Sequence, residues 1–595
     1  MNFAPFREIV LCDFEFSEPP GEHPRVICMV ARELRSGRLH RLWRHDLLRR
    51  REAPFPVGHD ILFIAFSAAA ELSCFLALGW PFPSHVLDLM FEFRALTHGH
   101  KLARDYNFLG ALSFYGLDIM PAEHKAMMQE RAINFDFSNP LFQPDMVDYC
   151  QEDTDSLGRL LVRMAPQLAG LGPVLMRGRY APALARMRWV GVPLDTVLAW
   201  AFQRHWQPLR LDVIAEIDQA YGVYDEAGHF HYDRFEALLA RKGIHNWPRT
   251  ETGKPILEDQ TLKALCLRYP DFLPFRELRA TLNQTKQEPI KLLVGADGRN
   301  RAHLWPFGAV TSRNLPKSNE FVFGRAVWLR GLIKPEPGYA VIYLDYSAAE
   351  VGIGAALSGD PVLIRDYQSD PYLALAKSIK YAPETATKHT HGATRELFKP
   401  VFLATNYGQG AKSLSETLGT SVLEAQAILD AHYRRYAVFK RWMDCAVSHA
   451  LLHRQIHTRF DWRMHVERDA NPRALRNWPL QSNCADILRL ACCLATERGL
   501  RVCAPVHDAL LVEARIEDIE EVVSMAIAAM KEASREVLDG FELKVGGGDK
   551  PVIYPNRYWD ERGAVMWKTV TDLVAKREAS ASYGSYSKTA DKWSA

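Results

Sequence analysis

Two aspartates at the ends of apolar runs are the first candidates for chemistry. Asp345 terminates AVIYLD, and Asp508 directly precedes ALLVEA. Both runs predict β-strands, and pairing of these strands would place the two carboxylates side by side. Carboxylates on a rigid scaffold are preferred ligands of Mg²⁺, and phosphoryl transfer can use two such cations about 3.5–4 Å apart. A strand-end Asp alone is more often a cap or turn residue, but the pair indicates a metal-dependent phosphoryl-transfer site.

A stretch between these aspartates carries a second group of candidates. In RELFKPVFLATNYG, Arg395, Lys399, Leu403 and Tyr407 follow one another at intervals of four, which places them on one face of a helix. Taken alone, this face could be a solvated basic stripe. Between two acidic strand ends it is better interpreted as a clamp for a triphosphate, because cations neutralise phosphate charge.

Two segments nearer the N-terminus also carry acidic residues at regular spacings. In LCDFEF, Asp13 and Glu15 alternate along a predicted strand, so both side chains lie on one face. In YCQEDTD, Tyr149 and Asp153 have the i, i+4 spacing of neighbours on a helix. These four residues indicate a second acidic site.

The elements that must position these residues change in type along the chain. Strands predicted at 8–16 and 61–66, with a helix at 68–78, indicate an α/β domain that reaches about residue 165. Helical spacing dominates from 166 to about 290. A helical stretch over 360–455 then separates the strands that carry Asp345 and Asp508, which suggests a split α/β domain.

Composition sets limits on the class of protein. The chain has 595 residues, so we expect three or four domains, and 48% apolar with 24% charged residues is typical of a globular protein. Ten cysteines without CxxC spacing indicate neither a zinc site nor a disulfide framework. The chain has no secretion signal and no apolar run of membrane-spanning length, so we expect an intracellular protein. A net charge of +2 does not by itself favour DNA binding.

The motifs between about 290 and 560 together resemble those of family A DNA polymerases, the DNA polymerase I or Klenow-like group. LDYSAAE resembles motif A (DYSQIE), the segment from Arg395 to Gly408 resembles motif B, and VHDA resembles motif C (VHDE). TSR at 311–313 and the pattern R-x₃-N-x-P-x-Q-x₃-AD from Arg473 to Asp486 also match. The 5′-nuclease domain of cellular members is absent from this sequence, and the divergent motifs resemble bacteriophage or prophage members.

The resemblance implies roles for the matching positions. Asp345 and Asp508 would be metal ligands, and Lys399 would be the general acid for pyrophosphate. The nucleotide-binding residues would be Arg395, Lys399, Leu403, Tyr407, Glu350 and Tyr346, with Glu350 excluding a 2′-hydroxyl. The DNA-binding residues would be Arg313, Arg473, Asn477, Gln481, His507 and Lys254; Lys254 belongs to a turn, RTETGK, that could equally be an exposed polar turn.

Several positions depart from the family pattern. Ala348 and Ala349 stand where Gln and Ile are usual, Leu403 where an aromatic is usual, and Ala509 where Glu is usual. None of these changes removes a metal ligand. They alter the nucleotide pocket, so fidelity and sugar selection are not carried over from the family.

The N-terminal acidic residues resemble the metal site of DEDD-type 3′→5′ exonucleases with a Tyr in the third motif. Asp13, Glu15 and Asp153 would hold metals and Tyr149 would orient water. For the middle ligand, aligning SAAAELSCFLALG places Glu71 where Asp is usual and Ser67 where Asn is usual; Asp60 and Asp88 are alternatives.

The implied architecture is a multidomain α/β and α fold, in which an RNase H-like exonuclease domain precedes a right-hand polymerase. The expected divisions are exonuclease 1–165, connecting helices and thumb 166–290, palm 291–359, fingers 360–455, second palm part 456–565 and a disordered tail 566–595. Two Mg²⁺ ions per site are expected, with Mn²⁺ as a substitute, and primer-template DNA and dNTPs as partners. We expect a monomer in the cytoplasm, that of the host if phage-encoded. Rival interpretations are a DNA-binding exonuclease with a weak polymerase domain, and a noncatalytic replisome scaffold.

Overall fold

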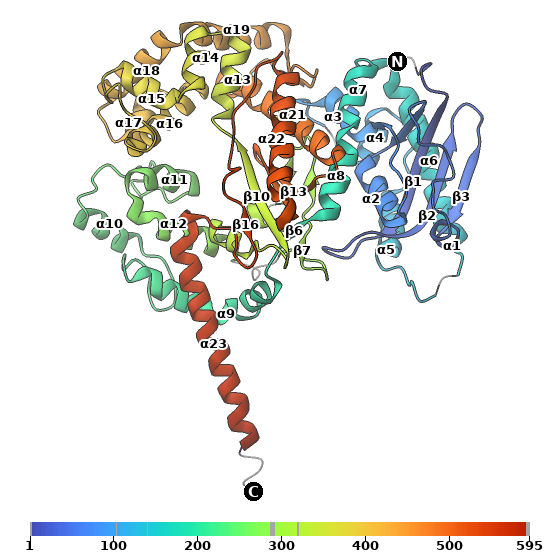
Figure 1. Ribbon diagram of the computed structural model, residues 1–595, viewed down its shortest axis with the longest axis horizontal. Helices are drawn as coiled ribbons and strands as arrows, with labels where there is room; N and C mark the ends of the chain where they lie inside the picture. Colours follow the sequence, from blue (N-terminus) through green and yellow to red (C-terminus); the bar gives the residue numbers. More distant parts are fainter. Residues whose placement is uncertain (1–2, 103, 140, 286–291, 318–319, 591–595) are drawn as a thin grey trace.

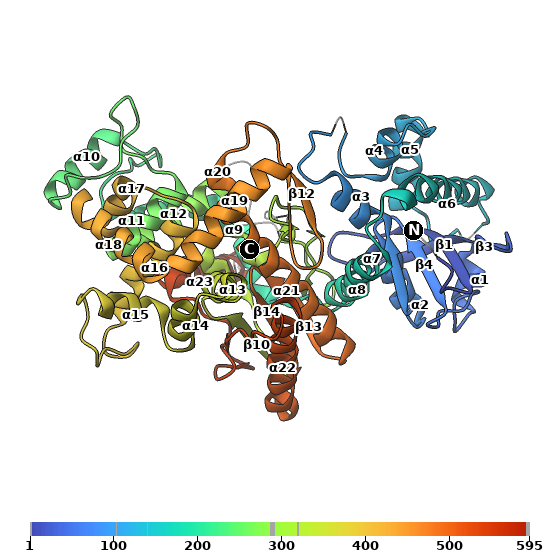
Figure 2. The same ribbon diagram turned by 90° about the horizontal axis from the view of Figure 1, so that it is seen from above.

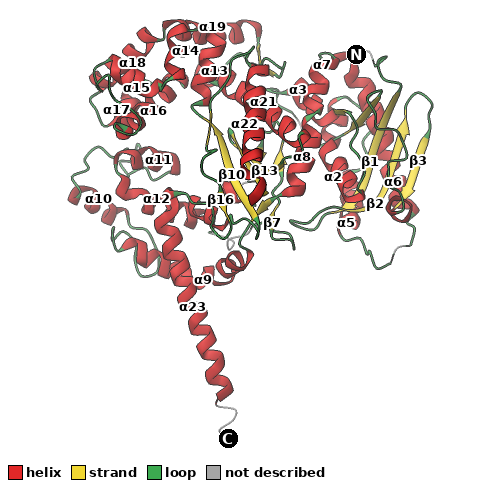
Figure 3. Ribbon diagram, in the orientation of Figure 1, coloured by secondary structure: helices red, strands yellow, loops and turns green. Residues whose placement is uncertain are grey.

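The computed structural model describes residues 3–590 except 103, 140, 286–291 and 318–319 (Figure 1). Figure 2 shows the N-terminal domain at one end and the helical domains at the other, with a second sheet between them. Figure 3 shows that the two larger sheets are separate and that helices cover both. The protein is therefore built from several domains, each with its own secondary-structure layers.

The N-terminal domain contains a five-stranded sheet in the order β3-β2-β1-β4-β5. β1 pairs antiparallel with β2 and parallel with β4, and β4 pairs parallel with β5. The strands are β1 Glu8–Ser17, β2 Arg25–Glu33, β3 Leu39–Trp43, β4 Ile61–Ala65 and β5 His85–Asp88. The helices are α1 Arg44–Leu48, α2 Ala68–Leu78, α3 Leu89–Thr97, α4 Phe108–Phe114, α5 Ala122–Ile133 and α6 Pro144–Met164.

Alternation along β1 decides which helix each of its side chains meets. Phe14 packs against Phe75 of α2, with ring centroids 6.0 Å apart, whereas Leu11 belongs to the apolar cluster that includes Leu157 of α6. Odd-numbered positions of β1 therefore face α6. Asp13 and Glu15 are odd-numbered, so the strand directs both toward the helix that carries Asp153.

Helices α7 and α8 connect this domain to the helical domain that follows. The helices of this region are α7 Leu171–Gly178, α8 Tyr180–Val190, α9 Thr196–Asp218, α10 Tyr232–Arg241, α11 Asp259–Arg268 and α12 Leu273–Gln284. The apolar residues of α9 to α12 join a second core cluster that includes Phe202, Trp206 and Phe275. Up to residue 285, where the described part of this region ends, the helical character predicted for 166–290 agrees with these elements.

The central sheet has the order β13-β14-β10-β15, and β16 also pairs with β10. Its strands are β10 Tyr339–Tyr346, β13 Arg501–Val506, β14 Ala509–Arg515, β15 Val545–Gly546 and β16 Val552–Ile553. Helices α13 Ala349–Ser358, α21 Trp478–Glu497 and α22 Ile519–Val537 pack on it or beside it. The predicted strands at 340–345 and 509–514 are thus adjacent and antiparallel.

The segment between these strands is helical, as the spacing predicts. Its helices are α14 Pro361–Gln368, α15 Pro371–Ser378, α16 Gly392–Asn406, α17 Ala411–Leu418, α18 Val422–Arg435, α19 Ala437–His453 and α20 Pro472–Arg476. Figure 1 shows α14–α19 grouped at the upper left, above α10–α12, and α17 contacts α11.

The end of the chain differs from the predicted disordered tail over 566–595. Helix α23 runs from Ala564 to Ala590 and projects away from the domains in Figure 1, and 591–595 lie outside the described residues. Its first turns bury Met566, Trp567, Val570 and Val574 in the same cluster as α9 and α12. These apolar residues at three- and four-residue spacing start the helix, and the polar sequence beyond them continues it.

Candidate active sites

The first site is formed by the ends of β10 and β14. Asp345 lies opposite Ala509 in the register, so Asp508 is its neighbour, and the Tyr346 backbone N–H donates to the Asp508 carbonyl over 3.3 Å. Burial, together with the charge and hydrogen bond of Asp508, raises the pKa of Asp345 to about 7. Two hard carboxylates that oppose each other's ionisation form a donor set suited to Mg²⁺.

His507 determines how Asp508 is presented. It opens the two-residue turn between Val506 and Ala509 and has a φ of 58°, in the left-handed region that non-glycine residues seldom adopt. Such backbone strain is concentrated at functional sites. The turn therefore holds Asp508 at the tip of the hairpin, beside Asp345.

Helix α16 carries the predicted cationic face. Arg395 Nε donates to Asp370 Oδ2 over 2.5 Å, and Lys399 Nζ donates to Glu396 Oε2 over 2.6 Å. Further along, Leu403 and Tyr407 are 49% and 40% exposed. Both cations can therefore exchange an intramolecular carboxylate for another anion without unfolding the helix.

The side chain of Glu350 contacts several of the predicted residues. Its carboxylate accepts from Asn477 Nδ2 and Gln481 Nε2 at 3.3 Å each and lies 3.7 Å from Arg313 Nη2. Gln481 also donates to the hydroxyl of Tyr407. α13, α16 and α21 are thereby joined through one hydrogen-bonded group beside the acidic pair.

Arg473, Lys254 and Tyr346 are not part of that group. Arg473 is exposed on α20, near Gly408, and Lys254 is exposed in the turn after α10. Tyr346 differs from the prediction of a nucleotide-binding side chain. It is 1% exposed, and its hydroxyl donates to the Met530 carbonyl over 2.6 Å, because alternation on β10 turns it away from the face of Asp345.

The second site is a cavity of about 370 Å³ in the N-terminal domain. Asp13, Glu15, Tyr149 and Asp153 all line it, so β1 and α6 bring the predicted residues together. Burial, together with the charge of Asp153, raises the pKa of Asp13 to about 8. As at the first site, clustered carboxylates make ionisation costly without a cation, and their oxygens suit Mg²⁺.

Glu71 joins this cluster from α2. It is 5% exposed, and burial together with the charge of Asp13 raises its pKa well above the usual range. Within the described part of the chain, its Oε2 has no hydrogen-bond partner. A buried carboxylate oxygen without a partner, next to other carboxylates, is what a metal ligand would present.

The two alternatives to Glu71 have other roles in the structure. Asp60 is exposed on the surface, where it pairs with Arg7 Nε at 2.6 Å. Asp88 is buried and caps two helices, since it accepts from the N–H groups of Ser67 and Ala68 at α2 and of Met90 and Phe91 at α3. Asp88 therefore has a stabilising role.

Replacing Asp88 by Ala is expected to lower the free energy of unfolding by about 2–4 kcal/mol, because two helices lose their N-terminal cap at once. Thermal and urea unfolding of the whole chain would measure this change. Asp60→Ala is the matched control and is expected to change stability by less than about 0.5 kcal/mol, as for other surface substitutions. Equal effects of the two substitutions would contradict the capping role.

Two residues of the second site were not predicted from the sequence. Lys125 of α5 lines the cavity, and its Nζ donates to Asp153 Oδ2 over 2.6 Å. The Cys150 thiol donates to Asp13 Oδ2 over 3.4 Å, and ligand atoms of Asp13, Glu15 and Cys150 lie within 4.8 Å of one another. Cys150 could have been found from the sequence, because it stands within YCQEDTD beside Tyr149. Nothing in the residues around Lys125 indicates that Lys125 contacts Asp153.

Comparison with known proteins gives matches over most of the chain. The family described as "DNA polymerase family A" matches residues 240–548. "DNA polymerase I, thermostable" of Thermus thermophilus is 28% identical over 406 residues, 62% of this chain and 46% of that protein. DNA polymerase I of Chloroflexus aurantiacus is 26% identical over 415 residues, 64% of this chain and 42% of that protein. The chain thus spans less than half the length of these relatives.

A solved structure has the same fold over nearly the whole chain. It is the POL domain of Pol1 from M. smegmatis in complex with DNA primer-template and dNTP, with a TM-score of 0.63 and 18% identity. The match covers 90% of this chain and 96% of that one. Among the described residues, no helix is long and apolar enough to cross a membrane.

Proposed function

This chain belongs to DNA polymerase family A, and on that premise we propose that it extends a DNA primer along a DNA template with deoxynucleoside triphosphates. One observation carries the proposal: Asp345 and Asp508 lie side by side at the tips of paired strands, next to the group centred on Glu350. The pattern supports two-metal phosphoryl transfer, in which hard carboxylate ligands are needed at one edge of a rigid sheet.

The residues around the acidic pair have distinct tasks in this reaction. Arg395 and Lys399 exchange Asp370 and Glu396 for the triphosphate, which bears more negative charge than a carboxylate. Lys399 then donates a proton to the departing pyrophosphate. Glu350, held by Asn477 and Gln481, is fixed where it can exclude a 2′-hydroxyl from the sugar site.

Asp345 and Asp508 would hold Mg²⁺, with Mn²⁺ as a substitute. When bound, the ions lower the pKa of the primer 3′-hydroxyl and neutralise charge on the phosphates. The two aspartates contribute by keeping their oxygens on one side of the sheet. His507 contributes by fixing the turn from which Asp508 projects.

A labelled primer-template incubated with the intact chain, Mg²⁺ and dNTPs tests the polymerase proposal. With all four dNTPs, we expect extension to the end of the template. When a single dNTP is supplied, only the one complementary to the template base should be added. No extension is expected in EDTA. Absence of extension with both Mg²⁺ and Mn²⁺, while dNTP-free shortening of the primer persists, would instead support an exonuclease with a weak or inactive polymerase domain.

A second activity, 3′→5′ removal of primer ends, is favoured by the cavity that Asp13, Glu15 and Asp153 line, with Glu71 buried beside Asp13. Tyr149 lines the same cavity and would orient the attacking water. Two acidic sites in separate domains support a polymerase that also proofreads. We propose primer-template DNA and dNTPs as its partners, a monomeric state, and DNA replication, in a phage or its host, as its setting.

Replacing Lys125 by Met is expected to slow dNTP-free shortening by about a hundredfold, because removing one preorganised positive group from a phosphoryl-transfer site has effects of this size. Its ammonium lies 2.6 Å from Asp153, within reach of a phosphate bound at the acidic cluster. Single-turnover shortening of a labelled strand would measure the rate. Lys125→Arg keeps the charge and should retain more activity than Lys125→Met; equal losses in both variants would contradict an electrostatic role.

A further inference from the structure

Three side chains that could ligate a metal meet beside the acidic cavity, and one of them is a thiol. Ligand atoms of Asp13, Glu15 and Cys150 lie within 4.8 Å of one another. Within the described part of the chain, no other three His, Cys, Asp or Glu side chains bring their ligand atoms this close. Carboxylates are hard ligands and a thiolate is a soft one, so the group is chemically mixed.

The packing of α6 against β1 fixes the position of the thiol. Cys150 follows Tyr149 on α6 and is 0% exposed. Its Sγ donates to the Asp13 backbone carbonyl over 3.3 Å and to Asp13 Oδ2 over 3.4 Å. Because a thiol is a weak donor, these contacts hold the sulfur against Asp13 and can be exchanged for a stronger bond.

The separation of sulfur and oxygen fits two ligands of one tetrahedral cation. Zinc binds thiolate sulfur at about 2.3 Å and carboxylate oxygen at about 2.0–2.2 Å, which places two such ligands about 3.5 Å apart. The distance from Cys150 Sγ to Asp13 Oδ2 is 3.4 Å. Mg²⁺ requires oxygen ligands, whereas thiolates select Zn²⁺. The sulfur therefore adds a preference that the carboxylates alone do not have.

The acidic residues of the site differ in their partners. Asp153 accepts from the ammonium of Lys125 over 2.6 Å, which neutralises its charge. Asp13 instead receives the uncharged thiol of Cys150, and Glu15 brings a further carboxylate close to both. A divalent cation held by Asp13, Glu15 and the thiolate would neutralise the part of the site with which Lys125 does not pair.

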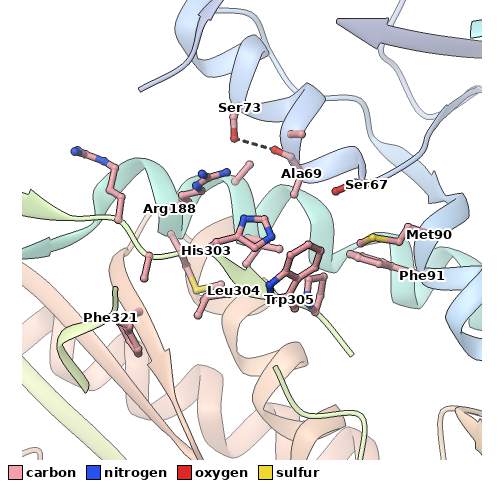
Figure 4. A pocket seen from close by; sticks show the side chains of 18 of the residues that line it. Ser67, Ala69, Ser73, Met90, Phe91, Arg188, His303, Leu304, Trp305 and Phe321 are labelled. Atoms are coloured by element: carbon pink, nitrogen blue, oxygen red, sulfur yellow. Dashed lines mark hydrogen bonds between the residues drawn. The ribbon is translucent and has the colours of Figure 1, made fainter. Parts of the chain in front are cut away.

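The acidic cavity gives a cation access to this group, since Asp13 and Glu15 line it. A neighbouring cavity of about 300 Å³ has a different lining (Figure 4). Arg188 and His303 are among its residues, and none of the residues that line it is a carboxylate. A guanidinium without carboxylates repels a divalent cation, so the acidic cavity is the favoured position of the two.

We propose that Cys150 is a metal ligand that makes this site selective for a thiophilic divalent cation of the Zn²⁺ class, held together with Asp13 and Glu15. On binding, the S–H bond breaks, its proton passes to solvent and the sulfur electron pair forms the bond to the cation. The ligands come from β1 and α6, which is why cysteine spacing along the chain gave no sign of them. The inference rests on the proposed exonuclease function for its consequence, competition between Zn²⁺ and Mg²⁺ at Asp13.

The test uses Co²⁺ as a spectroscopic probe, because a thiolate bound to Co²⁺ gives a near-ultraviolet charge-transfer band and oxygen ligands do not. The intact reduced chain, freed of metal, should develop this band with one equivalent of Co²⁺. Zn²⁺ in equal amount should abolish the band, and Mg²⁺ should leave it in place even at about a thousandfold excess. Cys150→Ser should give no band.

Two other cysteines provide matched controls. Cys74 is buried in the same domain, on α2, and Cys445 is exposed on α19. Cys74→Ser and Cys445→Ser should both retain the band. A band that persists in Cys150→Ser, or disappears in Cys445→Ser, would overturn the proposal, as would its absence from the intact chain.

A second variant covers the case in which Cys150→Ser does not fold, which circular dichroism would reveal. Asp13→Asn keeps the thiol but removes a ligand, so it should need at least about tenfold more Co²⁺ to develop the same band. A Co²⁺ requirement unchanged in Asp13→Asn would show that the thiolate binds the metal elsewhere, against the proposal.

Primer shortening separates this inference from the function on which it rests. At fixed Mg²⁺, the Zn²⁺ concentration that half-maximally changes the shortening rate should rise at least about tenfold in Cys150→Ser. An unchanged concentration would contradict competition at Asp13. If the intact chain shortens no primer in Mg²⁺, the exonuclease proposal fails, and the Co²⁺ band still decides whether Cys150 is a metal ligand.

Discussion

Replacing Asp345 by Asn is expected to slow primer extension by at least about a thousandfold, because loss of a metal ligand removes several kcal/mol of transition-state stabilisation. Asn keeps the size of the side chain, so the packing of β10 is conserved. The rate would be measured as single-nucleotide incorporation under single-turnover conditions. dNTP-free shortening should stay within about twofold, since surface and distant changes have effects of this size.

The matched control for Asp345→Asn is Asp518→Asn. Asp518 is exposed beyond the other end of β14, far along the strand from Asp508. Normal extension by Asp345→Asn would show that the acidic pair is not the polymerase centre. Loss of both extension and shortening would indicate a folding defect, which circular dichroism and thermal unfolding of the same preparation would reveal.

Replacing Asp13 by Asn is expected to give the converse result. The rate at which a labelled strand is shortened without dNTPs should fall by at least about a thousandfold, because this substitution also removes a metal ligand. The rate of primer extension should not change. The control is Asp60→Asn, because Asp60 belongs to the same domain but is exposed and paired with Arg7. This variant should shorten the strand at the rate of the intact chain. With dNTPs present, Asp13→Asn should retain mismatched primer ends that the intact chain removes.

One outcome would count against this second site, and another would count against Glu71 as one of its ligands. If Asp13→Asn shortens the primer as fast as the intact chain, the cavity of Asp13 and Asp153 is not an exonuclease centre. If Glu71→Gln has no effect while Asp13→Asn does, Glu71 is not a metal ligand and the site works with the remaining carboxylates. Its unpartnered Oε2 leads us to expect a loss.

The elements that carry the candidate residues could be predicted from local sequence. The helix expected at 68–78 is α2, Ala68–Leu78, and the strand expected at 8–16 is β1, Glu8–Ser17. Apolar spacing determines such elements because each side chain needs only its neighbours a few positions away to define a face. The same spacing at Val570 and Val574 was present in the segment predicted as a tail, where it starts α23.

Other features depended on contacts between distant residues. Local sequence offered Glu71, Asp60 and Asp88 for one role, and only packing separates them: Glu71 lies against Asp13, Asp88 caps two helices and Asp60 faces solvent. Tyr346 follows Asp345 directly, yet alternation on a strand covered by α22 buries it.

By itself, the sequence determined the family, the strand ends that carry Asp345 and Asp508, and the face of α16, because these depend on residue types at short spacings. The tertiary structure alone decided that Lys125 meets Asp153 and that Asp88 caps two helices. These contacts join residues on different elements, and their free energy comes from burial and charge pairing that no local pattern records.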